Sequence, residues 1–436
     1  MSNLLGNSYR VLIFGQSHSP MIGAVIEGVP AGVAPDMDFI RAFMARRAPG
    51  RDALSTARAE ADVPKIISGL NERGETCGAP LCAVIENADP RSRDYDALRD
   101  VPRPGHADFA AWAKYAGHND IRGGGQFSGR LTAPLCFAGA LAMQLLRERG
   151  VRVRARIHSI AGIPDAPVDL ADPPLDAIAG EGLPTVDPGA AQRMTQAILE
   201  ARAAGDSVGG VVECFATGLP AGLGEPMFDG VENRVARALF GIPAVRGVEF
   251  GLGFAAAEMR GSAHNDPFRM AGGRVVTAGN HHGGALGGIT TGMPLAVRAA
   301  FKPTPSIALE QRSVSLGRRE DATLAVRGRH DPCVVPRAVP CVEAAVACAL
   351  LDMMLEEVKS WNGMKFASTS TPSTTSWSNC SRGAWPAAPR SPGPSSRPPG
   401  PSAIAPASGP SSTASPPRRA RSWPPTCARC TSTYST

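Results

Sequence analysis

Residues 135–150, LCFAGALAMQLLRERG, and residues 342–358, VEAAVACALLDMMLEEV, are two long apolar segments with helical spacing. Shorter runs between and before them alternate in the manner of strands: RVLIFG at 10–15, GAVIEGV at 23–29 and GGVVECFATGL at 209–219. Helices and strands are therefore interleaved along the chain. The pattern predicts a mixed α and β fold but does not determine its topology.

The composition indicates a globular protein with a small anionic partner. The chain has 436 residues, of which 43% are hydrophobic, so it can form a substantial core. Its formal net charge is only +6 and its arginines are dispersed, which argues against nucleic acid as a partner. No apolar run approaches the roughly 18 residues of a membrane span, and the N-terminus lacks a signal pattern. We expect a cytoplasmic protein without a membrane partner.

The ten cysteines do not form a recognisable framework. Those outside the last 70 or so residues contain no CxxC pair and are scattered through the chain, at Cys77, Cys82, Cys136, Cys214, Cys333, Cys341 and Cys348. This distribution favours reduced, partly buried thiols over a disulfide scaffold or a zinc site. We expect no metal.

The character of the sequence changes near residue 357. Residues 366–436 are dominated by Ser, Thr, Pro, Ala and Arg, with few aliphatic residues to bury. Such a segment cannot offset its chain entropy by forming a core. We predict one catalytic domain at 1–357 and a low-complexity, disordered tail at 358–436.

Three glycine- or proline-containing loops carry a histidine each: His18 in FGQSHSP, His106 in RPGHAD and His330 in RGRHDP. A single histidine beside a strand is more often structural than catalytic. Recurrence in three loops, two of which also carry arginine, favours a shared pocket. Further arginines lie in ARRAPGR and RGGGQFSGR, and Lys302, Thr304 and Ser306 lie in FKPTPS.

These residue types suit anions. Guanidinium groups match carboxylates and phosphates, and glycine-rich turns expose backbone N–H groups to anionic oxygens. Solvated surface arginines are the ordinary alternative, but most of these arginines lie within a few residues of Gly or Pro. No strand–GxGxxG–helix unit is present, which disfavours a nucleotide-dependent oxidoreductase.

Three segments resemble the signature regions of the chorismate synthase family in order and spacing: FGQSHSPMIGAVIEGVPAG (14–32), GGGQFSGRLTAPLCFAGAL (123–141) and RHDPCVVPRAVPCVEAAVACALL (329–351). The resemblance covers about residues 5–357. It implies an α+β fold, a sandwich of antiparallel sheets around a central helical layer, and a homotetramer.

The resemblance also implies an activity. Members of the family are lyases that remove phosphate from 5-enolpyruvylshikimate 3-phosphate by a 1,4-elimination, giving chorismate in the shikimate pathway of aromatic amino acid biosynthesis. They require reduced FMN, although no net redox change occurs. A substrate with two carboxylates and a phosphate, beside a flavin phosphate, would need a set of cationic loops such as this one.

The resemblance carries over to individual residues. His18, His106 and Asp331 match catalytic positions: two general acids and an aspartate that assists proton removal. The matched substrate contacts are Ser17, Arg47, Arg103, Ser128, Arg130 and Arg329. The matched flavin contacts are Arg47, Gln126, Phe127, Ser128, Pro243, Ala244, Gly287, Lys302, Pro303, Thr304, Pro305, Ser306 and Arg329.

The sequence departs from the family pattern near these residues. Gln16 replaces a glutamate before the Ser–His pair, which removes a charge beside His18. Gln126 and Phe127 stand where many members have Arg and Ser. Ala53 replaces a second arginine associated with NADPH. We therefore expect a separate reductase to supply reduced FMN, with NADPH as an indirect reductant.

Two alternatives remain open from the sequence. The first is a catalytically impaired FMN-binding homologue, which the retention of His18, His106 and Asp331 disfavours. The second concerns the tail: another reading frame of plausible codons at residues 365–381 can encode an amphipathic helix similar to that of helical chorismate mutases. We expect the nucleotide sequence to decide whether the tail is an out-of-frame chorismate mutase domain.

Overall fold

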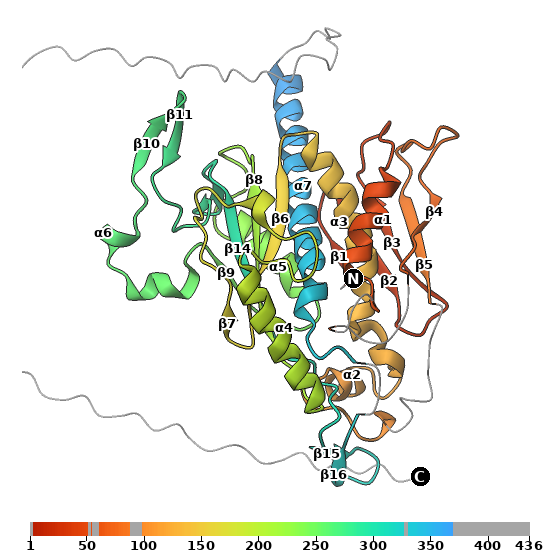
Figure 1. Ribbon diagram of the computed structural model, residues 1–436. Helices are drawn as coiled ribbons and strands as arrows, with labels where there is room; N and C mark the ends of the chain where they lie inside the picture. The colour runs from red at the N-terminus through yellow and green to blue at the C-terminus, as the bar shows by residue number, and fades with distance from the viewer. Residues whose placement is uncertain (1–2, 51–53, 55–60, 88–97, 327–329, 369–436) are drawn as a thin grey trace, which may run out of the picture. The chain divides into compact units, whose positions relative to one another are not determined.

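The computed structural model describes residues 3–50, 54, 61–87, 98–326 and 330–368. Two five-stranded antiparallel sheets form its outer layers (Figure 1). The first has the order β1-β2-β3-β5-β4 and the second β7-β6-β8-β14-β9. The first contains β1 (Leu4–Leu5), β2 (Arg10–Gly15), β3 (Met21–Glu27), β4 (Lys65–Ser68) and β5 (Leu81–Glu86). The second contains β6 (Arg152–Ile160), β7 (Ile163–Pro164), β8 (Gly210–Thr217), β9 (Val245–Phe250) and β14 (Leu295–Phe301).

Helices form the layer between the sheets (Figure 1). The layer contains α1 (Met37–Arg47), α3 (Thr132–Arg147), α5 (Val231–Phe240) and α7 (Val335–Ser368), whereas α4 (Pro188–Ala203) packs against β6 and β7. Helix α3 contacts the first sheet, and α7 contacts the second. The predicted β-α-β sandwich is therefore confirmed.

The two apolar segments of the sequence form the centre of this layer. Almost every residue of α3 is buried, as expected for a helix that is apolar on all sides. Helices α3 and α7 lie in close contact at Gly139, where an added Cβ would lie 2.2 Å from Cβ of Ala344. Glycine at 139 is thus required by the close approach of the two helices.

The hydropathy of α3 and α7 is explained by this position. The sequence-based statement that no apolar run approaches the length of a membrane span is wrong by length and composition alone, because two helical stretches, Gly129–Arg147 and Val335–Glu357, pass that test. In the fold, 83% and 89% of their most apolar windows are buried. They are core helices of the sandwich.

Charged side chains connect the layers. Buried Glu343 of α7 pairs with Arg46 of α1 and accepts a hydrogen bond from Ala155 N of β6 at 2.8 Å. Near the middle of α7, Asp352 accepts hydrogen bonds from the backbone N–H groups of residues 7–9 and pairs with Arg234 of α5. Both carboxylates are inside the core and both are satisfied by several partners.

Smaller elements border the sandwich. They are α2 (Asp108–Lys114), α6 (Gly261–His264), the 3₁₀ turns Arg122–Phe127, Gly129–Leu131, Leu175–Ala177 and Gly253–Glu258, and three two-stranded ribbons. The ribbons are β10 (Phe268–Ala271) with β11 (Arg274–Thr277), β12 (Ala285–Leu286) with β13 (Ile289–Thr290), and β15 (Gln311–Ser315) with β16 (Glu320–Leu324).

The predicted boundary at residue 357 falls within α7, which continues to Ser368. The predicted disordered tail, with the proposed out-of-frame segment, otherwise lies at 369–436, outside the described residues.

Candidate active site

A cavity of about 500 Å³ lies at the end of the helical layer where α7 begins and the turns preceding α3 are placed. This is within the usual size range of small-molecule sites. The described residues that line it include five cationic side chains, Arg47, Arg103, Arg130, Lys302 and Arg337, against the single carboxylate of Asp331. The cavity is therefore suited to anions.

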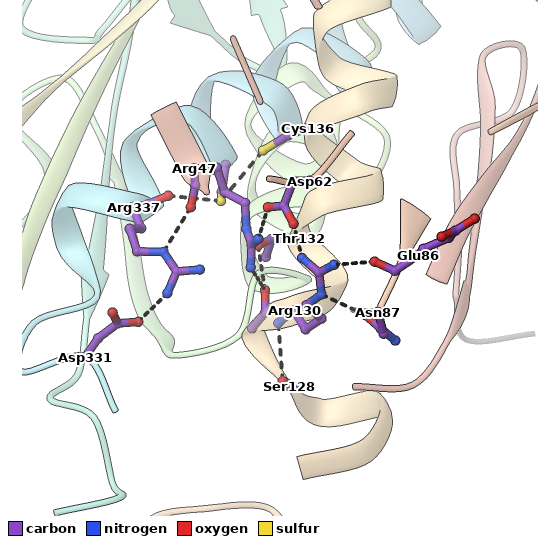
Figure 2. Close-up of polar contacts among 12 residues, drawn as sticks. Arg47, Asp62, Glu86, Asn87, Ser128, Arg130, Thr132, Cys136, Asp331 and Arg337 are labelled. Carbon is purple, nitrogen blue, oxygen red and sulfur yellow. Dashed lines mark hydrogen bonds and ion pairs between the residues drawn. The ribbon is translucent and has the colours of Figure 1, made fainter. Parts of the chain in front are cut away.

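Two arginines at one wall share the carboxylate of Asp62 (Figure 2). Arg47 also donates to Thr132 Oγ1 at 3.0 Å and to the carbonyl of Gly129 at 3.1 Å. Burial alone would raise the pKa of Asp62, but the charges and hydrogen bonds of Arg47 and Arg130 outweigh it and lower that pKa. Asp62 therefore holds both guanidinium groups in place as an ionised carboxylate.

The same network extends to the polar turn at residues 16–19. Arg130 Nε donates to Asn87 Oδ1 at 2.9 Å (Figure 2). The amide of Asn87 in turn donates to the carbonyls of Gln16 and Ser19, at 3.2 and 2.7 Å. The turn that carries His18 is thus fixed relative to the arginine pair.

Ser17 and His18 lie next to the cavity wall, although the cavity-lining residues do not include them. A Cβ added at Gly123, which lines the cavity with φ +62°, would lie 2.4 Å from Ser17 Oγ and 2.7 Å from His18 Nε2. Both side chains are buried, and Ser17 Oγ has no hydrogen-bond partner among the described residues. A side chain at position 123 would lie between His18 and the cavity. Glycine at this position therefore keeps His18 next to the cavity.

The RPGHAD loop forms a compact ionic cluster at a second wall. Arg103 binds Asp108 through Nε at 2.7 Å and Nη2 at 2.8 Å, and donates to Ser306 Oγ at 3.1 Å. Nδ1 of His106 lies 2.6 Å from Asp108 Oδ1. Burial would raise the pKa of Asp108, but hydrogen bonds from Arg103 and His106 hold it far below its usual range.

The contact with Asp108 determines which ring nitrogen of His106 can exchange a proton with a ligand in the cavity. An ionised carboxylate can only accept, so the proton of the His106–Asp108 contact resides on Nδ1. The other nitrogen, Nε2, lies 3.4 Å from Arg103 Nη2 and next to Gly124, where an added Cβ would be 3.3 Å from it. His106 therefore has Nε2 as the atom that can hold or transfer a proton at the cavity.

The loop before α7 supplies Asp331, and the first turn of α7 supplies Arg337. Arg337 Nη1 lies 2.5 Å from Asp331 Oδ2, and its Nε donates to the carbonyl of Arg47 at 2.9 Å (Figure 2). Burial lowers the pKa of Arg337, an effect that the charge of Asp331 opposes. The pair connects the third wall of the cavity to the Arg47 wall.

Most of the sequence-predicted residues gather around this cavity. The predicted residues that line it are Arg47, Arg103, His106, Gln126, Phe127, Ser128, Arg130, Pro243, Ala244, Lys302, Thr304, Pro305, Ser306 and Asp331. Pro303 lies between two of them. Gly287 does not line the cavity; it is exposed in the turn between β12 and β13. Arg329 and Ala53 lie outside the described residues.

The structure adds residues that sequence reasoning missed. Asp62 has no motif around it, and only the fold reveals it as the partner of two arginines. Asp108 could have been found, since it closes the Arg-x-x-His-x-Asp spacing of RPGHAD. Arg337, Thr132 and Cys341 line the cavity from helices whose apolar pattern predicts only core.

The cavity also meets a test for a flavin phosphate. Thr304 lines it with an Oγ1 that is buried and unpartnered among the described residues, and Lys302 lies two residues away. Burial and the nearby charge of Arg246 lower the pKa of Lys302. A hydroxyl donor beside clustered cations is the chemistry that holds a phosphate.

An α+β sandwich with a cationic cavity of this kind is the framework of an enzyme acting on small anions. Comparisons with known proteins identify the family to which this enzyme belongs. A family model for chorismate synthase matches residues 9–355. A chorismate synthase of Thermococcus kodakarensis is 49% identical over 352 residues, covering 81% of this chain and 97% of the relative. One of Lancefieldella parvula is 44% identical over 376 residues, covering 83% and 99%.

Comparison of the fold with a solved structure supports the same family. A crystal structure of chorismate synthase superposes with a TM-score of 0.63 at 28% identity, covering 81% of this chain and 93% of that one. The chain belongs to the chorismate synthase family. It is a carbon–oxygen lyase of the shikimate pathway, and membership of the family implies a requirement for reduced flavin.

Proposed function

We propose that the cavity binds reduced FMN together with 5-enolpyruvylshikimate 3-phosphate, and that the residues described above perform the 1,4-elimination. The observation that carries this proposal is the set of five cationic side chains around one cavity of about 500 Å³. The substrate has two carboxylates and a phosphate, and FMN adds another phosphate. Fixed guanidinium groups orient such a pair without reorganising during the reaction.

The side chains divide into holding groups and proton-handling groups. Arg47 and Arg130, fixed by Asp62, orient substrate anions; Lys302, Thr304 and Ser306 hold the flavin phosphate. Arg103 and Asp108 position His106. Reduced FMN, when bound, supplies transient electron donation to the substrate. His18 protonates the departing phosphate, Nε2 of His106 handles a proton near the flavin, and Asp331 assists removal of the ring proton.

His106→Ala tests this division. Removing a proton donor rather than an anion clamp should lower kcat by about 10²–10⁴-fold while leaving FMN affinity nearly unchanged. Phosphate release under anaerobic conditions gives kcat, and FMN fluorescence gives affinity. Normal turnover with a large loss of FMN affinity would contradict the assigned role.

Arg329→Ala should instead weaken binding of both ligands.

The supply of reduced flavin is part of the proposal. Ala53 stands where some members carry an arginine associated with NADPH, so we propose that a separate cytoplasmic reductase provides reduced FMN and that NADPH acts only indirectly. Phosphate release by the purified chain with oxidised FMN and NADPH alone would contradict this.

We also propose a homotetramer. The ribbon β10–β11 extends away from the two sheets (Figure 1), and its Phe268 and Met270 are both 68% exposed. Exposed apolar side chains on one projecting element favour a protein interface. Light scattering of the purified chain should give four times the chain mass; a monomer would contradict the proposal.

A further inference from the structure

A pair of cysteines lies at the inner wall of the cavity, and the proposed chemistry does not use it. Cys341 of α7 lines the cavity, while Cys136 of α3 is fully buried behind it. Their Sγ atoms are 3.9 Å apart. Both thiols are free in the structure.

The packing of the two helices brings these sulfurs together. Cys136 stands three residues before Gly139, and Cys341 three residues before Ala344, the two residues at which α3 and α7 are in close contact. Residues three apart share a helix face, so the cysteines face one another one turn away from that contact. A disulfide has an S–S length of about 2 Å, so closure requires the sulfurs to approach by about 2 Å.

The surroundings favour attack by Cys341. A hydrogen bond from Cys136, followed by the positive charge of Arg47, lowers the pKa of Cys341, although burial opposes the shift. Burial raises the pKa of Cys136. Thiolates are the reactive form of cysteine, so Cys341, the cysteine of the pair that lines the cavity, is also the more nucleophilic one.

We propose that Cys341 is an oxidation site at which small hydroperoxides entering the cavity are reduced, with Cys136 as the resolving thiol that closes a reversible disulfide between α3 and α7.

The chemistry balances with one hydroperoxide and two thiols. The Cys341 thiolate attacks an oxygen of hydrogen peroxide; the O–O bond breaks, an S–O bond forms, and hydroxide leaves as water with the proton of the thiol. The sulfur is oxidised to sulfenic acid. The Cys136 thiol then attacks that sulfur; the S–S bond forms, the S–O bond breaks, and the second water leaves with the Cys136 proton.

The disulfide would alter the site. Arg337, which lines the cavity, is four residues before Cys341, and the Cys341 thiol donates to its carbonyl at 3.3 Å. Thr132, which binds Arg47, is four residues before Cys136. Because the helices are already in contact at Gly139 and Ala344, closing the disulfide has to shift the turns that carry the two cysteines, and with them both walls. We therefore expect loss of phosphate-release activity on oxidation and recovery with dithiothreitol.

Peptide mapping of the full chain by mass spectrometry tests the proposal. The reduced protein is treated with hydrogen peroxide until Cys77, which is exposed, is oxidised. A peptide linking Cys136 to Cys341 should appear and be lost on reduction. If both peptides remain reduced and unlinked when Cys77 has reacted, the proposal is wrong.

Variants separate the roles of the two thiols. Cys136→Ala should stop the reaction at a sulfenic acid on Cys341 that dimedone labels, and Cys341→Ala should leave Cys136 reduced. Cys348→Ala is the matched control, because Cys348 is a buried cysteine on the same helix that does not line the cavity; its disulfide yield should equal that of the wild type. A disulfide that forms without loss of activity would overturn the coupling to the site.

Discussion

At the scale of single residues, the site depends on carboxylates that are not expected to touch the substrate. Asp62 is completely buried between Arg47 and Arg130, and Asp108 joins Arg103 to His106. Each carboxylate neutralises part of the positive charge and fixes where the rest of it lies. Loss of either would free cationic groups from their fixed positions before any ligand binds.

Asp62→Asn tests this account at the level of stability. Removing the charge leaves two buried arginines without their shared counterion, which should lower the free energy of unfolding by about 3 kcal/mol. Asp38→Asn is the control, because Asp38 forms an exposed pair with Arg41 and should change stability by less than about 0.5 kcal/mol. Urea unfolding measures both; equal effects would contradict the role of Asp62.

The same carboxylate should shape the acid stability of the protein. Asp62 has a lowered pKa in the folded state, because the arginines outweigh the effect of burial. Its stabilising contribution is therefore complete above its unfolded pKa of about 3.9 and is lost as the pH falls below that value through the folded pKa. We predict a shallower acid decline in the unfolding free energy of Asp62→Asn than of the wild type between about pH 5 and pH 2. Parallel profiles would contradict this.

At the scale of elements, the helical layer determines how close the functional loops can lie. Helices α3 and α7 make contact through Gly139 and Ala344, and their N-terminal ends deliver Thr132, Arg337 and Cys341 to the cavity. A wider spacing between the helices would separate the walls that these residues form.

Gly139→Ala measures the importance of this contact. The added methyl would lie 2.2 Å from Cβ of Ala344, so the helices must separate, at a cost of about 2 kcal/mol in unfolding free energy. Gly180→Ala is the matched control, since its added Cβ meets nothing within 4 Å. Thermal unfolding measures the midpoint of each variant. Equal midpoints would contradict the prediction, because they would show that the two helices can move apart without loss of stability.

Sequence patterns could predict some of these elements and not others. The apolar periods of α3 and α7 and the alternation in β2, β3 and β8 were sufficient to predict helices and strands. The sandwich topology followed only from the family resemblance, because periodicity carries no information on which elements pair. Histidines and arginines in glycine-rich loops marked most of the cavity, whereas Asp62 and Arg337 could not be found, since their partners are set by tertiary contacts.

At the scale of the whole molecule, the cavity is assembled from segments that lie far apart in the chain. Residues near 47, 103, 130, 302 and 337 meet there. Glu343 and Asp352 on α7 hold that assembly to α1, β6 and the N-terminal loop. The parts of this site therefore depend on the complete sandwich.

Phosphate release from 5-enolpyruvylshikimate 3-phosphate, measured anaerobically with the purified chain and chemically reduced FMN, tests the central claim most directly. Release with reduced FMN, and none with oxidised FMN, is the result we predict; it would also show that Gln16 is tolerated beside His18. A folded protein that binds FMN but releases no phosphate would contradict the account and favour a catalytically impaired homologue.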